Sequence, residues 1–406
     1  MAFREYDEAR DLKAIDRIWR EIAWLDSPEQ APALKDFLSV GDCLTATIAD
    51  EAECAVHIVP GSMRYLDESL EMCAVTAVTT SRLARKQGFA RDLTALQLAK
   101  GASQGAEIAS LGMFDQGYYD RLGFGTGSYE HTFVLDPATL LVDARFRPPV
   151  RLDKEAWRDV HAAMMGRMAG HGTCCLTPPE FIKGELGFQE NGFGLGYYEG
   201  ETLTHFFWAV PRGENGPYRI TFIAYRNVGE LMELLALIKS LGDQVSTVIM
   251  REPPHIQLQD LLREPFRNRR NTKASEYANE HRSLAYWQIR ALDIAACVSK
   301  RRWNGPAVRF NLSLRDPLYE LLEGEPWRGV GGDYVVHVGE SSEAAPGQES
   351  GLPTLQAGVG AFTRMLFGIV SASKLAVTDE LSGPAALLTQ LDAAFVLPTA
   401  RTTWDF

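Results

Sequence analysis

The chain has 406 residues, more than one ordinary hydrophobic core holds, so its length predicts two or three domains. Its 46% hydrophobic and 23% charged residues are typical of a soluble globular protein. The 53 acidic residues outnumber the 41 basic ones, which gives a formal net charge of −12. This balance argues against a nucleic-acid-binding protein and is compatible with cationic substrates, although solubility alone also accounts for it.

The sequence carries no targeting, membrane or metal signal. Its first eight residues lack the apolar core of a signal peptide, and no uninterrupted apolar run reaches membrane-spanning length. The six cysteines fit no CxxC or zinc-ligand spacing; they are Cys43, Cys54, Cys73, Cys174, Cys175 and Cys297. We therefore expect a cytoplasmic protein with reduced thiols, no metal, no membrane contact and no nucleic-acid partner.

The first 70 residues predict two helices followed by two strands. Apolar residues recur at helical spacing from Leu12 to Ile22, and a second helix is expected over 32–38. Strands are expected over 43–49 and 55–59. A polar connection is expected from Pro60 to Ser69.

A strand, a glycine turn and a helix come next. Apolar and β-branched residues over 72–80 predict the strand, and helix formers over 92–100 predict the helix. The turn between them contains Arg85, Lys86 and Gly88. The unpaired amides and the positive dipole end of the helix favour an anion, and Gly88 lets the backbone approach it closely. The stretch therefore predicts a pyrophosphate site, the alternative being a solvated basic turn.

A tyrosine motif follows this turn. The run over 107–114 predicts a strand, and Tyr119 stands four residues before the Gly123-Phe124 pair. The alternating run from Tyr129 to Val134 predicts a further strand.

The order of elements then repeats. A composition shift ending in two prolines places a domain boundary near residue 145, and helices and strands are expected at 153–157, 196–198, 202–210, 218–225, 230–241 and 244–250. The counterpart of the glycine turn contains Arg226 and Gly229 at the same spacing. Glu230 and Glu233 put negative charge where a phosphate would sit, so we interpret this copy as structural.

A third unit is expected from about Tyr286. Helices are expected over 290–298, 359–367 and 384–395, strands over 307–314, 333–338 and 354–357, and a loop over 340–350.

Several of these stretches resemble known families. The run Arg85-Lys86-Gln87-Gly88-Phe89-Ala90 resembles the acyl-CoA pyrophosphate loop of the GNAT superfamily of N-acetyltransferases, and Tyr118–Gly125 resembles the segment that closes the acetyl-CoA site there. The run Gly360–Gly368 resembles a sterol-carrier-like module. Over essentially its whole length the chain is similar to the bacterial enhanced-intracellular-survival acetyltransferases.

This resemblance implies an α+β fold with three domains. Residues 1–145 would form a catalytic GNAT domain and residues 146–285 a degenerate second one, each with a mixed central sheet flanked by helices. Residues 286–406 would form a sterol-carrier-protein-like α/β domain that ends in the active-site carboxylate. The family uses acetyl-CoA, acetylates aminoglycosides at several amines and some protein lysines, and assembles as a homohexamer. One departure is Lys86-Gln87, which makes the phosphate-binding turn less cationic than in the family.

The resemblance also implies roles for individual residues. Tyr119 would be the general acid that protonates the CoA thiolate, and the α-carboxylate of Phe406 would be the general base. The N–H of Val78 would stabilise the oxyanion of the tetrahedral intermediate. Acetyl-CoA would be bound by Val78, Thr80, Arg85, Lys86, Gly88, Phe89, Ala90, Phe114 and Asp115. The amine acceptor would be bound by Trp24, Asp26 and Asp405, although the first two also suit an ordinary exposed loop.

Two alternatives stay open. One keeps acetyl transfer and changes the acceptor to a polyamine, an arylalkylamine or a protein lysine. The other is a non-enzymatic lipid-binding protein built on the sterol-carrier-like unit.

Overall fold

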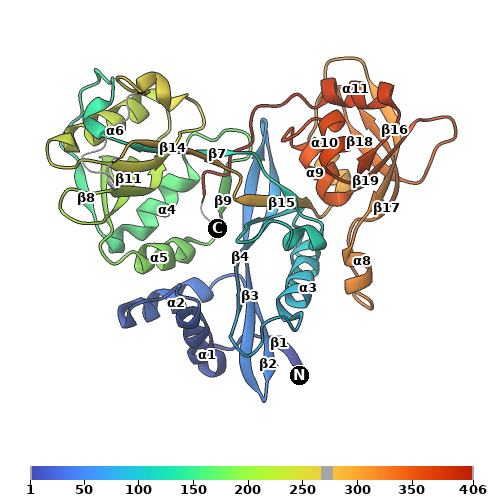
Figure 1. Ribbon diagram of the computed structural model, residues 1–406, viewed down its shortest axis with the longest axis horizontal. Coiled ribbons are helices and arrows are strands. Elements are labelled where there is room, and N and C mark those ends of the chain that lie inside the picture. Colours follow the sequence, from blue (N-terminus) through green and yellow to red (C-terminus); the bar gives the residue numbers. More distant parts are fainter. Residues whose placement is uncertain (1, 267–277, 405–406) are drawn as a thin grey trace.

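The computed structural model describes residues 2–266 and 278–404, which form three sheets in three lobes (Figure 1). The fold is a mixture of α and β structure with mixed sheets flanked by helices, as predicted. Figure 1 shows the first sheet at the centre, the second lobe in green and yellow on one side, and the third lobe in orange and red on the other.

The central sheet has the strand order β1-β2-β3-β4-β5-β15-β6, and β9 pairs with the far end of β3. Its strands are β1 (Ala2–Glu5), β2 (Asp42–Ile48), β3 (Glu51–Tyr65), β4 (Glu68–Thr80), β5 (Ile108–Gly112), β6 (Gly125–Thr126), β9 (Cys174–Leu176) and β15 (Trp287–Ala291).

Helices cover both faces of the central sheet: α1 (Glu8–Glu21), α2 (Ala31–Leu38) and α3 (Phe89–Ser103). Because side chains alternate along a strand, β4 supplies Met72 and Ala74 to the core under α1 and α2, and Cys73 and Val75 to the core under α3. Asp7 begins α1 by accepting a hydrogen bond from the N–H of Arg10.

The second lobe has a sheet of order β14-β7-β13-β12-β11-β10-β8. Its strands are β7 (Glu130–Leu135), β8 (Val150–Leu152), β10 (Phe193–Glu199), β11 (Thr202–Pro211), β12 (Tyr218–Ala224), β13 (Val248–Arg251) and β14 (Glu280–Leu284). Its helices are α4 (Trp157–Met165), α5 (Pro179–Phe188) and α6 (Val228–Ser240).

The third lobe has a sheet of order β18-β17-β16-β19-β20. Its strands are β16 (Val308–Arg315), β17 (Gly332–Val338), β18 (Glu343–Pro346), β19 (Thr354–Gly358) and β20 (Leu381–Ser382). Its helices are α7 (Ile294–Ser299), α8 (Leu318–Leu321), α9 (Val359–Leu366), α10 (Ala372–Thr378) and α11 (Ala385–Ala394).

The first two sheets exchange strands. After β6 the chain leaves the central sheet and forms β7 between β13 and β14 of the second sheet. After β14 it returns and forms β15 between β5 and β6 of the central sheet. The expected boundaries at 145 and 285 therefore do not coincide with sheet membership, because each sheet is completed by a strand from the other side of a boundary.

The internal repeat extends to the irregularities of the strands. The pairing of β3 with β4 shifts at Thr76, and the pairing of β11 with β12 shifts at Thr221. Just before its bulge, β4 pairs in parallel with β5, and β12 pairs in parallel with β13. Each pairing extends over only a few residues, and beyond the bulge the two strands separate. Bulges bend a strand and end its pairing. Both lobes therefore contain an opening at the equivalent place, between β4 and β5 in the first lobe and between β12 and β13 in the second.

Three segments differ from the sequence expectations. Residues 60–69 are not a polar connection, since β3 and β4 form one long hairpin that pairs from Tyr65–Glu68 to Cys54–Thr80. Pro60 is tolerated because it lies where the outer edge of β3 changes partner: the pairing with β2 ends at Ile58 of β3, and the pairing with β9 begins at Gly61 of β3.

The expected helix over 290–298 begins four residues later than predicted. Residues 287–291 are instead the buried strand β15, in which Arg290 forms a fully buried ion pair with Asp316 (2.6 Å). Asp293 then accepts a hydrogen bond from the N–H of Ala296 (2.9 Å) and begins α7. Likewise, the expected loop over 340–350 contains β18, which pairs with β17.

Candidate active site

The start of α3 forms an open anion site. Gly88 is the residue before the helix and has a φ of 87°, a conformation that favours glycine. No side chain caps the helix, so the N–H groups of its first turn remain available to a ligand. Phe89 is buried in the core, which leaves only its backbone to face an anion, and Ala90 beside it is half-buried.

Two cations stand beside these amides. Arg85 and Lys86 are both exposed in the turn, and Lys86 has a φ of 61°. Neither has a carboxylate partner among the residues that the structure describes, so both remain available to a diphosphate.

The opening between β4 and β5 lies next to this helix start. The parallel pairing of the two strands ends at Val75 and Leu111, while β4 continues to Thr80 against β3. Val78 and Thr80 are half-buried in this unpaired stretch. An extended ligand arm can therefore hydrogen-bond to the free edge of β4 as an added strand would.

Tyr119 brings a buried phenol to this region. It begins a short 3-10 helix (Tyr119–Leu122) and is 2% exposed, in the same apolar cluster as Phe89 and Val78. Burial raises the pKa of its phenol, and neighbouring Tyr118 raises it further. At neutral pH Tyr119 therefore keeps its proton and is suited to donate it.

Phe114 and Asp115 lie on the outer side of Tyr119. Phe114 is 72% exposed, and its ring contacts those of Tyr118 (5.3 Å) and Tyr119 (5.7 Å). The carboxylate of Asp115 is exposed, and its backbone carbonyl accepts a hydrogen bond from the N–H of Tyr118 (3.4 Å). Both residues thus border the opening without closing it.

The predicted acceptor residues lie on the other face of the central sheet. Trp24 and Asp26 are exposed in the connection between α1 and α2, and Trp24 packs edge-on against Trp19 (5.0 Å). Trp19 in turn contacts Phe37, which contacts His57 of β3. This aromatic row leads from the surface loop to the bulge of β4.

His57 is a site residue that the sequence did not indicate. It is buried, its Nε2 donates a hydrogen bond to the carbonyl of Val40 (2.6 Å), and its Nδ1 lies 2.8 Å from the hydroxyl of Thr76. Burial lowers its pKa to about 4, so the neutral ring accepts a hydrogen bond from Thr76. His57 thus holds the bulged residue of β4 in place. Residues 55–59 read only as an apolar strand, because a bulge leaves no mark in the sequence.

The C-terminal segment returns from the third lobe to the centre of the molecule (Figure 1). The N–H of Cys174 donates to the carbonyl of Thr402 (2.9 Å), and the N–H of Thr402 donates to Glu130 (3.1 Å). Trp404 is buried between Phe181 and Phe222. Asp405 and Phe406, predicted to bind the acceptor and to act as the base, lie outside the described residues.

The matching turn of the second lobe is closed by its own side chains. Asn227 caps α6 by accepting a hydrogen bond from the N–H of Glu230 (3.0 Å). Glu230 accepts the N–H of Arg226 (2.6 Å) and pairs with its guanidinium (2.6 Å). The carboxylate thus occupies the anion position, as the sequence indicated, whereas Glu233 pairs with Arg147 (2.9 Å).

The described part of the chain contains no group of three His, Cys, Asp or Glu side chains arranged to hold a metal ion. None of its helices is both long and apolar enough to cross a membrane.

Comparisons with known proteins agree with this geometry. Residues 4–127 match the model of an acetyltransferase (GNAT) domain, and residues 294–404 match that of a sterol carrier protein domain. A search of curated protein sequences found no match.

The whole chain also shares its fold with solved structures. Eis1 from Mycobacterium abscessus is 16% identical, with a TM-score of 0.76 and complete coverage of both chains. A GCN5-related N-acetyltransferase from Kribbella flavida is 19% identical, with a TM-score of 0.73 over 100% of this chain and 98% of that one. Another from Anabaena variabilis is 14% identical, with a TM-score of 0.74 over 100% and 99%. The chain therefore carries a GNAT acetyltransferase domain over residues 4–127 and a sterol carrier protein domain over residues 294–404.

Proposed function

We propose that the protein transfers the acetyl group of acetyl-CoA to a primary amine of a cationic acceptor, such as an aminoglycoside-like compound. The observation that carries the proposal is the open start of α3 beside the gap between β4 and β5. An unpaired helix start with two free cations suits the CoA diphosphate, and the free edge of β4 suits the pantetheine arm. The non-enzymatic alternative is set aside by the acetyltransferase domain.

The residues of this site suit direct acyl transfer. The amine nitrogen attacks the thioester carbonyl, and the N–H of Val78 holds the oxygen as negative charge develops on it. The C–S bond then breaks, and Tyr119 gives its proton to the departing thiolate, because its raised pKa keeps it protonated until that moment.

The acceptor must lose a proton, since an alkylamine has a pKa of about 10 and is mostly charged at pH 7. We propose the α-carboxylate of Phe406 as the base. The burial of Ala400, Thr402 and Trp404 supports this role, because Trp404 lies two residues before Phe406 in the chain and its ring packs near Phe181 of α5 (6.3 Å). Phe181 contacts Phe37 (4.8 Å) on the acceptor side of the sheet.

Trp24, Asp26 and Asp405 are the proposed acceptor-binding residues. An indole face and carboxylates attract a cationic amine, and the negative net charge of the protein raises its local concentration. By the same resemblance we propose that the protein assembles as a homohexamer, which light scattering after size-exclusion chromatography tests directly.

A panel of amines tests the proposal. Aminoglycosides, a polyamine, an arylalkylamine and a lysine peptide are each incubated with acetyl-CoA, and release of the CoA thiol is followed. We expect the fastest release with a multiply charged aminoglycoside. Faster release with the polyamine, the arylalkylamine or the peptide would show that this amine, and not an aminoglycoside, is the preferred acceptor. No release with any amine would contradict acetyl transfer.

A C-terminal extension tests the base. Residues added after Phe406 convert its carboxylate into an amide, so turnover should be lost while the thermal unfolding midpoint is kept. An equal N-terminal extension is the control, and full turnover with the C-terminal extension would exclude this carboxylate.

A further inference from the structure

A group of arginines faces a cavity on the second sheet, outside the proposed active site. Thr132 of β7 pairs with Arg251 of β13 on one side and with Arg282 of β14 on the other. Residues opposite one another in a sheet point to the same face, so these three side chains form a row.

A second row on the same face adds further arginines. Arg219 of β12 pairs with Ile249, which stands two residues before Arg251 and therefore points to the same side. Arg212 follows β11, and its N–H donates to the carbonyl of Pro217 (3.1 Å), which places it at the end of this row. Four arginines from four neighbouring segments thus line one cavity of about 680 Å³.

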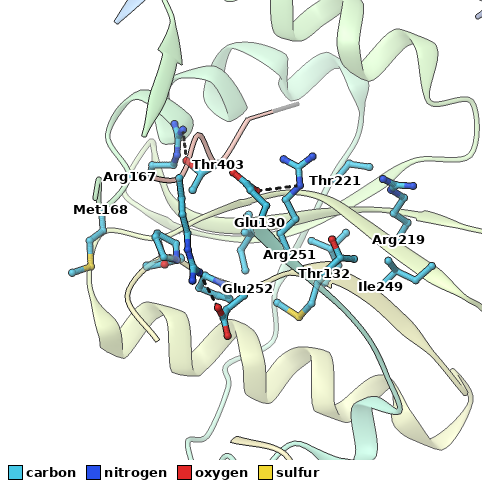
Figure 2. Close-up of a pocket in the computed structure, with 17 residues that line it drawn as sticks. Glu130, Thr132, Arg167, Met168, Arg219, Thr221, Ile249, Arg251, Glu252 and Thr403 are labelled. Atoms are coloured by element: carbon cyan, nitrogen blue, oxygen red, sulfur yellow. Dashed lines mark hydrogen bonds and ion pairs between the residues drawn. The ribbon is translucent and has the colours of Figure 1, made fainter. Parts of the chain in front are cut away.

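Two carboxylates, Glu130 and Glu280, also line this cavity, and each lies beside one of its arginines. Glu280 pairs with Arg282 (2.6 Å), and Glu130 accepts both the N–H and the hydroxyl of Thr402 while its other oxygen lies 3.7 Å from Arg251. Figure 2 shows Arg251 directed to Glu130 and Arg219 apart from both.

Arg212 and Arg219 have no carboxylate partner among the described residues. The pKa of Arg219 is lowered by partial loss of water around its guanidinium, although the side chain stays exposed, and by the like charges of Arg251, Arg212 and Arg282. In the described part of the chain, the four arginines of the cavity face only two carboxylates, Glu130 and Glu280, so an excess of positive charge remains on Arg212 and Arg219, and an anionic ligand would relieve its repulsion.

A second, smaller cavity of about 70 Å³ continues from the first into the opening between β12 and β13 (Figure 2). The two cavities share Arg219, Ile249 and Arg251. The inner one adds apolar side chains, among them Ile223, Tyr225 and Met250. Charged groups at the mouth and an apolar interior are the usual pattern of a small-molecule site.

We propose that this cavity binds a small organic phosphate, with its phosphate on Arg212 and Arg219 and its organic part in the opening between β12 and β13. A guanidinium matches phosphate oxygens with paired hydrogen bonds, and a phosphate group carries up to two negative charges. The closed start of α6 excludes the binding mode proposed for acetyl-CoA in the first lobe, so the phosphate lies on the sheet face instead.

Isothermal titration with pyrophosphate as the probe tests this site. The titration is made at low salt with CoA present at saturation, which occupies the proposed site at Gly88. We expect one equivalent of pyrophosphate to bind still, and the double variant Arg212→Ala/Arg219→Ala to bind it about tenfold more weakly or not at all. Both side chains are exposed, so this variant should retain its unfolding midpoint and acetyl transfer.

Arg309→Ala is the matched control, because Arg309 is an exposed arginine of the third lobe that pairs with Glu349 (2.6 Å). It should bind pyrophosphate as the unaltered protein does. Two outcomes would overturn the proposal: saturating CoA abolishes all pyrophosphate binding, or the double variant binds as tightly as the control.

Discussion

The starts of α3 and α6 occupy the same place in two repeated lobes and have opposite electrostatics. Before α3, Gly88 leaves the helix uncapped, and the cations of the turn have no acidic partner among the described residues. Before α6, Asn227 caps the helix and Glu230 holds both the backbone and the side chain of Arg226. The cap of Asn227 and the carboxylate of Glu230 therefore separate an open helix start from one that satisfies itself.

The strands before these helices differ in the same sense. His57 of β3 and Trp208 of β11 both precede the bulge in their pairing. His57 bonds to the bulged Thr76, whereas Trp208 is fully buried with an indole N–H that lacks a partner in the described structure. The first lobe thus supports its bulge with a titratable side chain, whereas in the second lobe the bulged Thr221 donates a hydrogen bond to the uncharged amide of Gln189 (3.0 Å).

The largest expected effect concerns the proton donor, which only the first lobe requires. Tyr119→Phe should lower kcat by about 100-fold or more and leave acetyl-CoA affinity within about twofold, because general acids contribute on this scale. Stopped-flow turnover and equilibrium binding measure the two quantities. Tyr118→Phe, beside it in the chain, is the control, and equal turnover of the two variants would remove Tyr119 from catalysis.

A pH dependence of stability should come from the first bulge. The pKa of His57 is about 4 when folded and near 6.5 when unfolded, so the unfolded chain binds the proton first as the pH falls. Stability should therefore decrease by about 3 kcal/mol between pH 6.5 and 4 from this residue. Thermal unfolding midpoints across that range measure it. His57→Gln should flatten the profile, and an unchanged slope would show that other groups cause it.

Converting the first helix start into the second tests the comparison directly. Arg91 stands three residues after Gly88, the position that Glu230 holds after Asn227. Arg91→Glu should raise the KM for acetyl-CoA about tenfold, because the new carboxylate occupies the anion position. Arg91→Gln removes the same charge without adding an acid and should change KM by less than about threefold. A similar KM in both variants would count against the anion site.

The smallest expected effect is the reverse change. Glu230→Ala leaves the N–H of Arg226 without its acceptor and should lower stability by about 1–3 kcal/mol, with acetyl transfer unchanged. Unfolding midpoints and kcat measure the two effects. A loss of turnover at unchanged stability would give the second lobe a catalytic role.

The sequence predicted individual helices, strands and turns better than it predicted which strands pair with one another. Gly88, the strand before it and the helix after it form as expected, because turn chemistry and periodicity act within a few residues. The exchange of β7 and β15 between the two sheets was not predicted. Each of these strands has a hydrophobic pattern that would suit either sheet. Only the fold determines which sheet each one completes.

The same limit explains the residues that were missed. Residues Pro60, Gly61 and Ser62 read as part of a polar connection, yet they lie in β3 and pair with β4, and Gly61 and Ser62 also pair with β9 from more than 100 residues away. His57 and the arginine face of the second sheet become visible only when strand register brings distant residues together.

A crystal structure with acetyl-CoA tests the central claim most directly. The account predicts the diphosphate on the amides at Gly88, Phe89 and Ala90 with Arg85 and Lys86 turned toward it, and an α6 start without ligand. A diphosphate bound at Asn227, or elsewhere with the Gly88 turn empty, would contradict it.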